Sequence, residues 1–237
     1  MVDSNALRVE RIEKVWTPNA KLYVPHQGEE IAFAFPAFGA NINQKVGKEI
    51  LSHNLKVPTG DYTASLLHPV YCNPRNSDEE RNVRDIMKNN WLWTFNQNLW
   101  TDKGVYVIQD LEAKGRSEEF DINELEKRLT EKWNNIRVSE NGRTRFAPKE
   151  SYKFGEHISD SLSKDGFVIA SYGIEGAKKL AEVSSKLRNN PVTYGIEIQK
   201  GNAPELRFSA LGEDGGRLRV DGSLWDDYYW GRAFGAL

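Results

Sequence analysis

The sequence has little of several things that define common classes of protein. It contains one cysteine, Cys72, and two methionines among its 237 residues. A single thiol excludes an intramolecular disulfide, and it also excludes zinc sites built from several cysteines. The fold must therefore be stabilised by packing, and a chain of this length can bury a core large enough for that.

Long hydrophobic runs are also missing. No stretch approaches twenty apolar residues, and charges are scattered through the first ten residues, where a signal peptide needs an uninterrupted apolar segment. We therefore expect a soluble protein without membrane insertion, cytoplasmic by default unless it is exported by a non-standard route. Positive and negative charges nearly cancel, at net −2, so the chain as a whole predicts no nucleic-acid partner.

Local patterns predict a single α+β domain over residues 1–237. Short apolar runs bounded by turn residues predict strands at 22–24, 31–35, 104–109, 167–172, 192–198, 206–210 and 217–220. Capping residues or helical periodicity predict helices at 41–55, 77–88, 122–133 and 175–188. From Leu206 onward no helical period remains, and glycines interrupt short strand-like pieces.

A pair of glycines, Gly173 and Gly176, lies between a predicted strand and a predicted helix. Backbone N–H groups at such a position can hold an anion. The segment lacks the lysine of a phosphate-binding loop, and Glu175 would repel a phosphate, so a structural turn is the favoured interpretation. The alternative function is an enzyme acting on a small polar or anionic substrate in a cleft near Gly173–Gly176, with His157, Asp160 or His68 as acid or base.

His68 and Cys72 are four residues apart and would share one face of a helix. Pro69 argues against a helix there, because proline is tolerated only near a helix start. We therefore predict that Cys72 is a small buried apolar residue, and we predict no metal site and no cofactor.

Two acidic groupings are further candidates. His157 is flanked by Glu156 and Asp160 without a second histidine nearby, a pattern that favours the acidic start of a helix over a metal site. Asp226 and Asp227 are adjacent and would point to opposite faces of an extended segment, so they cannot act as an acid–base pair. In a turn, the two carboxylates could still bind a cation.

The chain is rich in tryptophan, and its densest aromatic segment is Trp225-Asp-Asp-Tyr-Tyr-Trp230. Complete burial of this segment would place two carboxylates in the interior, so part of it must be exposed. Tyrosine and tryptophan mixed with small polar residues are typical of antibody binding loops. The sequence therefore predicts a ligand-binding surface without catalytic residues, and the alternative is a terminal strand whose aromatic side chains close the core.

The order of residues from Gly216 to Gly235 resembles the end of the variable proteins of diversity-generating retroelements, which have a C-type-lectin-like fold. In that family an Arg-Leu/Val-Gly-Gly-Ser-Trp-like strand precedes a diversified loop and a closing Gly-Phe strand. Here Asp221-Gly222 stands where two glycines are usual, and Leu224 is inserted before the tryptophan.

The resemblance implies a domain with a short twisted antiparallel sheet, flanking helices and turn-rich C-terminal strands. Its C-terminal segment, 206–237, would display diversified side chains to a macromolecular ligand, expected to be a protein. The displayed residues would be Arg219, Asp221, Ser223, Trp225, Asp226, Asp227, Tyr228, Tyr229, Trp230 and Arg232. By the two-residue period of a strand, Leu218, Val220 and Phe234 would point inward.

Other proteins with this fold bind calcium or catalyse reactions. Sugar-binding lectins hold calcium with characteristic residue triplets. Only Trp225-Asp-Asp227 partly matches one of these triplets, so no calcium is predicted. Formylglycine-generating enzymes use a pair of catalytic cysteines, which Cys72 alone cannot supply.

Overall fold

The computed structural model describes residues 7–11, 20–117, 119–225 and 227–237. Six α-helices occur in these residues: α1 (Asn43–Ser52), α2 (Gly60–Cys72), α3 (Asp78–Asn89), α4 (Ile122–Arg128), α5 (Ser159–Leu162) and α6 (Gly166–Ser185). The strands are β1 (Arg8–Arg11), β2 (Ala20–His26), β3 (Glu29–Phe35), β4 (Phe38–Asn41), β5 (Trp91–Thr101), β6 (Gly104–Gln109), β7 (Leu129–Trp133), β8 (Ile136–Ser139), β9 (Thr144–Pro148), β10 (Gly155–Glu156), β11 (Val192–Tyr194), β12 (Glu205–Asp214), β13 (Arg217–Leu224) and β14 (Gly231–Ala233).

The described strands form one small and one large sheet. The small sheet has the order β1-β2-β3, and the large one has the order β10-β11-β13-β12-β5-β6-β9-β8-β7, with β14 paired to both β4 and β5. Among the described strand pairs, β11–β13 and β14–β5 are parallel and the others are antiparallel. The predicted α+β class is confirmed, but the sheet is large and mixed where a short antiparallel one was expected.

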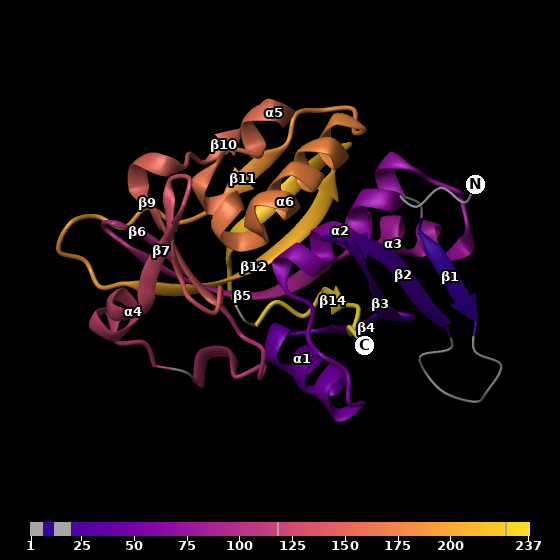
Figure 1. The fold of residues 1–237 in the computed structure, drawn as a ribbon, viewed down its shortest axis with the longest axis horizontal. Coiled ribbons are helices and arrows are strands. Elements are labelled where there is room, and N and C mark those ends of the chain that lie inside the picture. Colours follow the sequence, from indigo (N-terminus) through magenta and orange to yellow (C-terminus); the bar gives the residue numbers. More distant parts are fainter. Residues whose placement is uncertain (1–6, 12–19, 118, 226) are drawn as a thin grey trace.

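The helices α2 and α6 pack together beside the large sheet, whereas the small sheet lies at the opposite end of the molecule from β7 and β9 (Figure 1). Two glycines allow the close approach of α2 to α6. A Cβ atom on Gly60 would lie 2.1 Å from the carbonyl oxygen of Ser171, and one on Gly176 would lie 3.4 Å from the Cβ of Ala64. Later residues of α2 contact later residues of α6, so the two helices run in the same direction.

Helix α3 forms where the sequence predicts it. The hydroxyl of Ser77 accepts a hydrogen bond from the backbone N–H of Glu80, and three acidic residues occupy the first turn. This capping oxygen and these carboxylates complement the unpaired N–H groups at the start of a helix.

The strand predicted at 167–172 is wrong. These residues are buried in the first turns of α6, whose N-cap is Asp165. A helix that is apolar on every side has no amphipathic period, so its sequence looks like that of a buried strand. The predicted strand-to-helix turn at Gly173–Gly176 is likewise inside α6, where Gly173 has φ 72° and kinks the helix.

The structure corrects three further predictions. The helix expected at 122–133 ends at Arg128, and the following residues form a hairpin with β8 through Asn134, which has φ 50°. The strand expected at 192–198 ends at Tyr194. Pro69, which was expected to exclude a helix, lies inside α2; the helix continues to Cys72, and the carbonyl of Pro69 accepts a hydrogen bond from the N–H of Asn73.

Strand β5 is central to the core. It pairs with β6, β12 and β14, and its Trp93 and Trp100 side chains are completely buried. None of the described helices combines the length and the apolar composition that a membrane crossing requires.

Candidate functional site

The segment that joins β13 to β14, residues 225–230, is here named the aromatic loop; Asp226 lies outside the described residues. Its aromatic side chains are exposed: Trp225 by 48%, Tyr228 by 43%, Tyr229 by 62% and Trp230 by 65%. Large apolar side chains are more often buried than exposed, so four of them on one short loop form a notable patch. They do not close the core.

The first end of the aromatic loop is fixed by Gly222 on β13. Its carbonyl oxygen accepts hydrogen bonds from Nδ2 of Asn98, at 3.1 Å, and from Nε1 of Trp100, at 2.9 Å. A Cβ atom at this position would lie 2.3 Å from the ring of Phe167, so only glycine fits. The strand therefore enters the loop from a closely packed position against β5 and α6.

The second end is fixed by Gly231 on β14. The N–H of Trp91 donates to the carbonyl of Trp230 over 3.1 Å, and a Cβ on Gly231 would lie 1.7 Å from Nε1 of Trp93. That indole nitrogen donates to the carbonyl of Asn41 over 3.1 Å. Both ends of the aromatic loop are thus held by residues of a single strand, β5.

Trp225 is positioned by two arginines. The guanidinium carbon of Arg207, on β12, lies 3.3 Å from the centroid of the indole ring, and that of Arg116 lies 4.4 Å from it. Guanidinium groups are attracted to the negative face of an indole ring. Trp225 is therefore half exposed but held in one orientation.

A cleft of about 300 Å³ lies beside Tyr228 and Trp230 of the loop. Tyr228 meets Trp91 edge to face, with 6.4 Å between ring centroids. The guanidinium of Arg219 lies over Trp91 at 4.6 Å and over Tyr194 at 4.9 Å. The cleft is lined by Trp91, Arg219, Tyr228 and Trp230, together with Met87, Lys88, Asn89, Asn90, Gly212, Glu213 and Asp214.

Asp221 is not displayed, which corrects the prediction. It is 3% exposed, and its Oδ1 accepts hydrogen bonds from the N–H and the hydroxyl of Ser223. The ladder between β12 and β13 shifts register between Phe208 and Ala210, so the strict alternation of faces fails next to Asp221. Burial raises the pKa of the Asp221 carboxyl, although the bonds from Ser223 and the nearby guanidinium of Arg219 act against this.

The remaining predicted residues have different environments. Asp227 is exposed, Ser223 is partly buried, and Arg232 donates to the carbonyl of Gly39 over 3.0 Å. Arg232 therefore holds β14 against β4 and is not a freely displayed side chain. Leu218, Val220 and Phe234 are buried, as the sequence predicts.

The residues of the enzyme alternative do not meet. His157 is buried and contacts the hydroxyl of Thr193 at 2.9 Å, whereas His68 contacts Glu182 at 2.6 Å on another part of the molecule. Asp160 is exposed.

A separate cleft of about 370 Å³ is lined by Asp61 and Arg145. Both residues lie next to Gly173, since a Cβ there would be 3.8 Å from Nη1 of Arg145 and 3.9 Å from the Cβ of Asp61.

Sequence reasoning missed the partners of the aromatic loop. Trp91 and Arg207 are far from it in sequence and come beside it only through the pairing of β5, β12 and β13. The tryptophan-rich stretch that begins at Trp91 was the one visible signal.

Comparison of the chain with models of protein families, with curated proteins and with solved structures found no match in any of the three.

Proposed function

We propose that this protein binds a macromolecular ligand, namely another protein, through the aromatic loop and the adjacent cleft. The observation that supports this most strongly is the exposure of Trp225, Tyr228, Tyr229 and Trp230 on a loop whose two ends are held in the core. Tyrosine and tryptophan are the residue types that contribute most of the energy at protein interfaces. Because the loop ends are already ordered, binding orders few further residues, which favours affinity.

The cleft and the loop would act together. A ligand side chain that enters the cleft would contact Trp91 and Tyr228, while Tyr229 and Trp230 cover the surrounding surface. A pocket surrounded by aromatic contacts is the arrangement in which interface hot spots are found. Arg219 would face the ligand from the cleft wall.

We further propose a C-type-lectin-like scaffold with a diversified end, as in the variable proteins of diversity-generating retroelements. This finer proposal rests on the resemblance of residues 216–235 and on the placement of varied, exposed residue types between two closely packed glycines. Sequencing the locus in many closely related cells tests it. Substitutions should concentrate in codons 217–232 and fall at template adenines; a segment as constant as the rest of the gene would contradict diversification.

The binding function is tested separately. An array of purified proteins and glycans is probed with the wild-type protein, with the double variant Tyr229→Ala/Trp230→Ala, and with Ile158→Ala, a control that truncates an exposed apolar residue outside the loop. The ligand should bind the wild type and the control and lose binding to the double variant. Equal binding to all three proteins would reject the aromatic loop as the binding surface.

An enzyme acting on a small anionic substrate is the second candidate function. In its favour, Arg145 is buried, donates to the carbonyls of Gly142 and Ala170, and lines the second cleft, whose size suits a small molecule. Calorimetric titration with inorganic phosphate, for the wild type and for Arg145→Met, tests this candidate. Absence of binding, or equal binding to both proteins, would count against it.

A further inference from the structure

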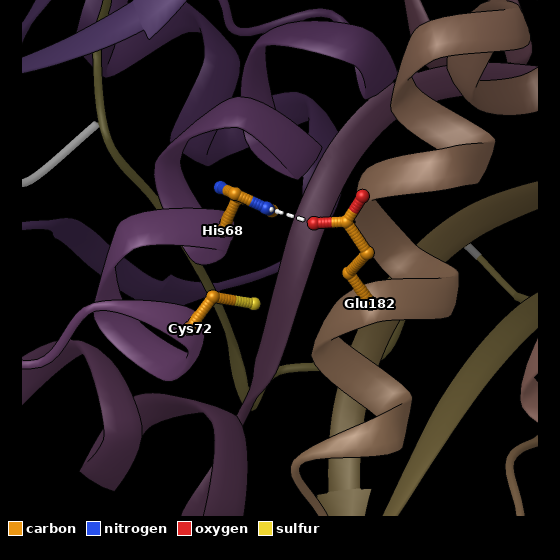
Figure 2. Close-up of side chains that lie close together, drawn as sticks. All are labelled: His68, Cys72 and Glu182. Atoms are coloured by element: carbon orange, nitrogen blue, oxygen red, sulfur yellow. Dashed lines mark hydrogen bonds and ion pairs between the residues drawn. The ribbon is translucent and has the colours of Figure 1, made fainter. Parts of the chain in front are cut away.

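A cluster of three metal-ligating residue types lies between α2 and α6. Figure 2 shows His68 and Cys72 on α2 with their side chains directed toward α6, from which Glu182 extends to meet them. Nε2 of His68 is 2.6 Å from Oε2 of Glu182, and the ligand atoms of the three residues all lie within 4.8 Å of one another. The three residues lie on α2 and α6, which carry no residue of the aromatic loop.

The helix is what brings the first two residues together. Because α2 continues through Pro69, His68 and Cys72 are separated by four residues on one helical face. The parallel packing of α6 then places Glu182 opposite that face, in the same way that it places Nζ of Lys179 2.8 Å from the hydroxyl of Ser65, one turn earlier.

We propose that His68, Cys72 and Glu182 form a binding site for a zinc ion. Zinc is bound in proteins by imidazole nitrogen, thiolate sulfur and carboxylate oxygen, and three protein ligands with water in the fourth position is a common arrangement. Magnesium and calcium prefer oxygen ligands throughout, so the thiol and the imidazole select against them.

The geometry requires a small adjustment. Zinc bonds of about 2.0–2.3 Å in a tetrahedron separate the ligand atoms by roughly 3.2–3.8 Å, which is longer than the bond from His68 to Glu182 and shorter than the outer limit of the cluster. The side chain of Glu182 is 62% exposed and can change rotamer, whereas that of His68 is 19% exposed and more tightly held. Zinc would replace the direct hydrogen bond between His68 and Glu182.

Protons compete with the metal at this site. Burial and the nearby Glu182 carboxylate raise the pKa of the Cys72 thiol to about 11, although Lys186 acts in the opposite direction. Zinc binds the thiolate form of cysteine, so coordination releases the thiol proton to solvent.

The experiment uses the full-length protein with CoCl₂ as a spectroscopic substitute and ZnCl₂ as the competing ion. The variants are Cys72→Ser, His68→Ala and Glu182→Gln. The matched control is Glu175→Gln, which alters an exposed carboxylate on the same helix whose partner is Lys178. Circular dichroism establishes that each variant is folded.

We expect one equivalent of cobalt to give a thiolate-to-cobalt charge-transfer band that zinc abolishes and that Cys72→Ser lacks. Loss of either other ligand should weaken zinc affinity by on the order of tenfold or more, and the control should bind as the wild type does. Zinc should also raise the melting temperature of the wild type and the control. Absence of the band, or equal zinc affinity in Glu182→Gln and the wild type, would overturn the proposal. Because Glu182 is exposed, its variant provides this test even if the other two do not fold.

Discussion

The guanidinium group of Arg207 lies over the indole ring of Trp225, with 3.3 Å between its central carbon and the ring centroid. Arg207 itself is buried, and it is held in place by the carboxylate of Glu205 and the carbonyl of Leu206. An aromatic residue at the start of the aromatic loop is therefore oriented by a strand that is fixed in the sheet.

This contact predicts a measurable energetic coupling. A double-mutant cycle with Arg207→Ala and Trp225→Ala should give a coupling free energy of about 0.5–1 kcal/mol in chemical denaturation, the usual value for a guanidinium over an indole ring at a partly exposed site. A cycle between Arg207→Ala and Tyr229→Ala serves as the control, since no such ring contact joins that pair in the described contacts. Coupling indistinguishable from the control would show that the stacking contributes nothing to stability.

The exposed aromatic residues should matter little for stability. We expect Tyr229→Ala and Trp230→Ala to change the free energy of unfolding by about 0.5 kcal/mol or less, because exposed substitutions away from special contacts rarely do more. Urea denaturation measures this directly. A loss of several kcal/mol would instead place these side chains in a packed interior.

Gly231, in contrast, should be intolerant of any side chain. The Cβ atom of Gly231→Ala would lie 1.7 Å from Nε1 of Trp93 and would disturb the bond from this indole to Asn41. Overpacking of this kind costs roughly 1–3 kcal/mol. Urea denaturation midpoints are compared for Gly231→Ala and Tyr229→Ala, two residues apart in the same region. The midpoint of Gly231→Ala should be the lower one, because Gly231 is closely packed and Tyr229 is exposed. Equal midpoints would contradict this difference.

Asp165 should make stability depend on pH. Burial raises its pKa from 3.8 to about 6, against the backbone hydrogen bonds that it accepts from Val168 and Lys153. The folded state therefore binds the proton more tightly than the unfolded state, and the free energy of unfolding should fall as the pH rises from about 4 to about 6. The total effect is on the order of 3 kcal/mol at 1.36 kcal/mol per pKa unit.

Asp165→Asn provides the test. Asparagine keeps the cap on α6 but does not titrate. The stability of the variant relative to the wild type should thus increase from pH 4 to pH 6, as measured by urea denaturation at each pH. Parallel curves for the two proteins would show that the carboxyl does not carry this dependence.

Local chemistry made some of the fold predictable. Ser77 and the acidic residues after it predict α3, and the two carboxylates next to Trp225 predict an exposed loop. Both predictions are possible because each signal lies within a few residues of the sequence. Residues 167–172 gave no such signal, since a fully buried helix and a buried strand have the same apolar composition.

Long-range pairing decided the rest. Residues Leu129–Trp133 have a helical sequence pattern but form a strand, because they pair with β8. Asp221 is buried where the register between β12 and β13 shifts. Proline misled the prediction of α2, since its missing N–H is tolerated near the end of that helix. The contacts of Trp91 and Arg207 with the aromatic loop depend on the complete sheet and cannot be found in a local pattern.

The attachment of both loop ends to β5 has a consequence for how this protein can change. Replacement of residues 225–230 by another sequence, or by a longer one, would leave the hydrogen bonds of Asn98 and Trp100 and the packing of Trp93 in place. Loop-closure entropy grows slowly, by about 0.6 kcal/mol for each doubling of length. Residues 225–230 can therefore be exchanged, whereas the residues of β5 that hold the loop ends cannot. We expect the same fold to form when loops of other sequences and other lengths replace this segment.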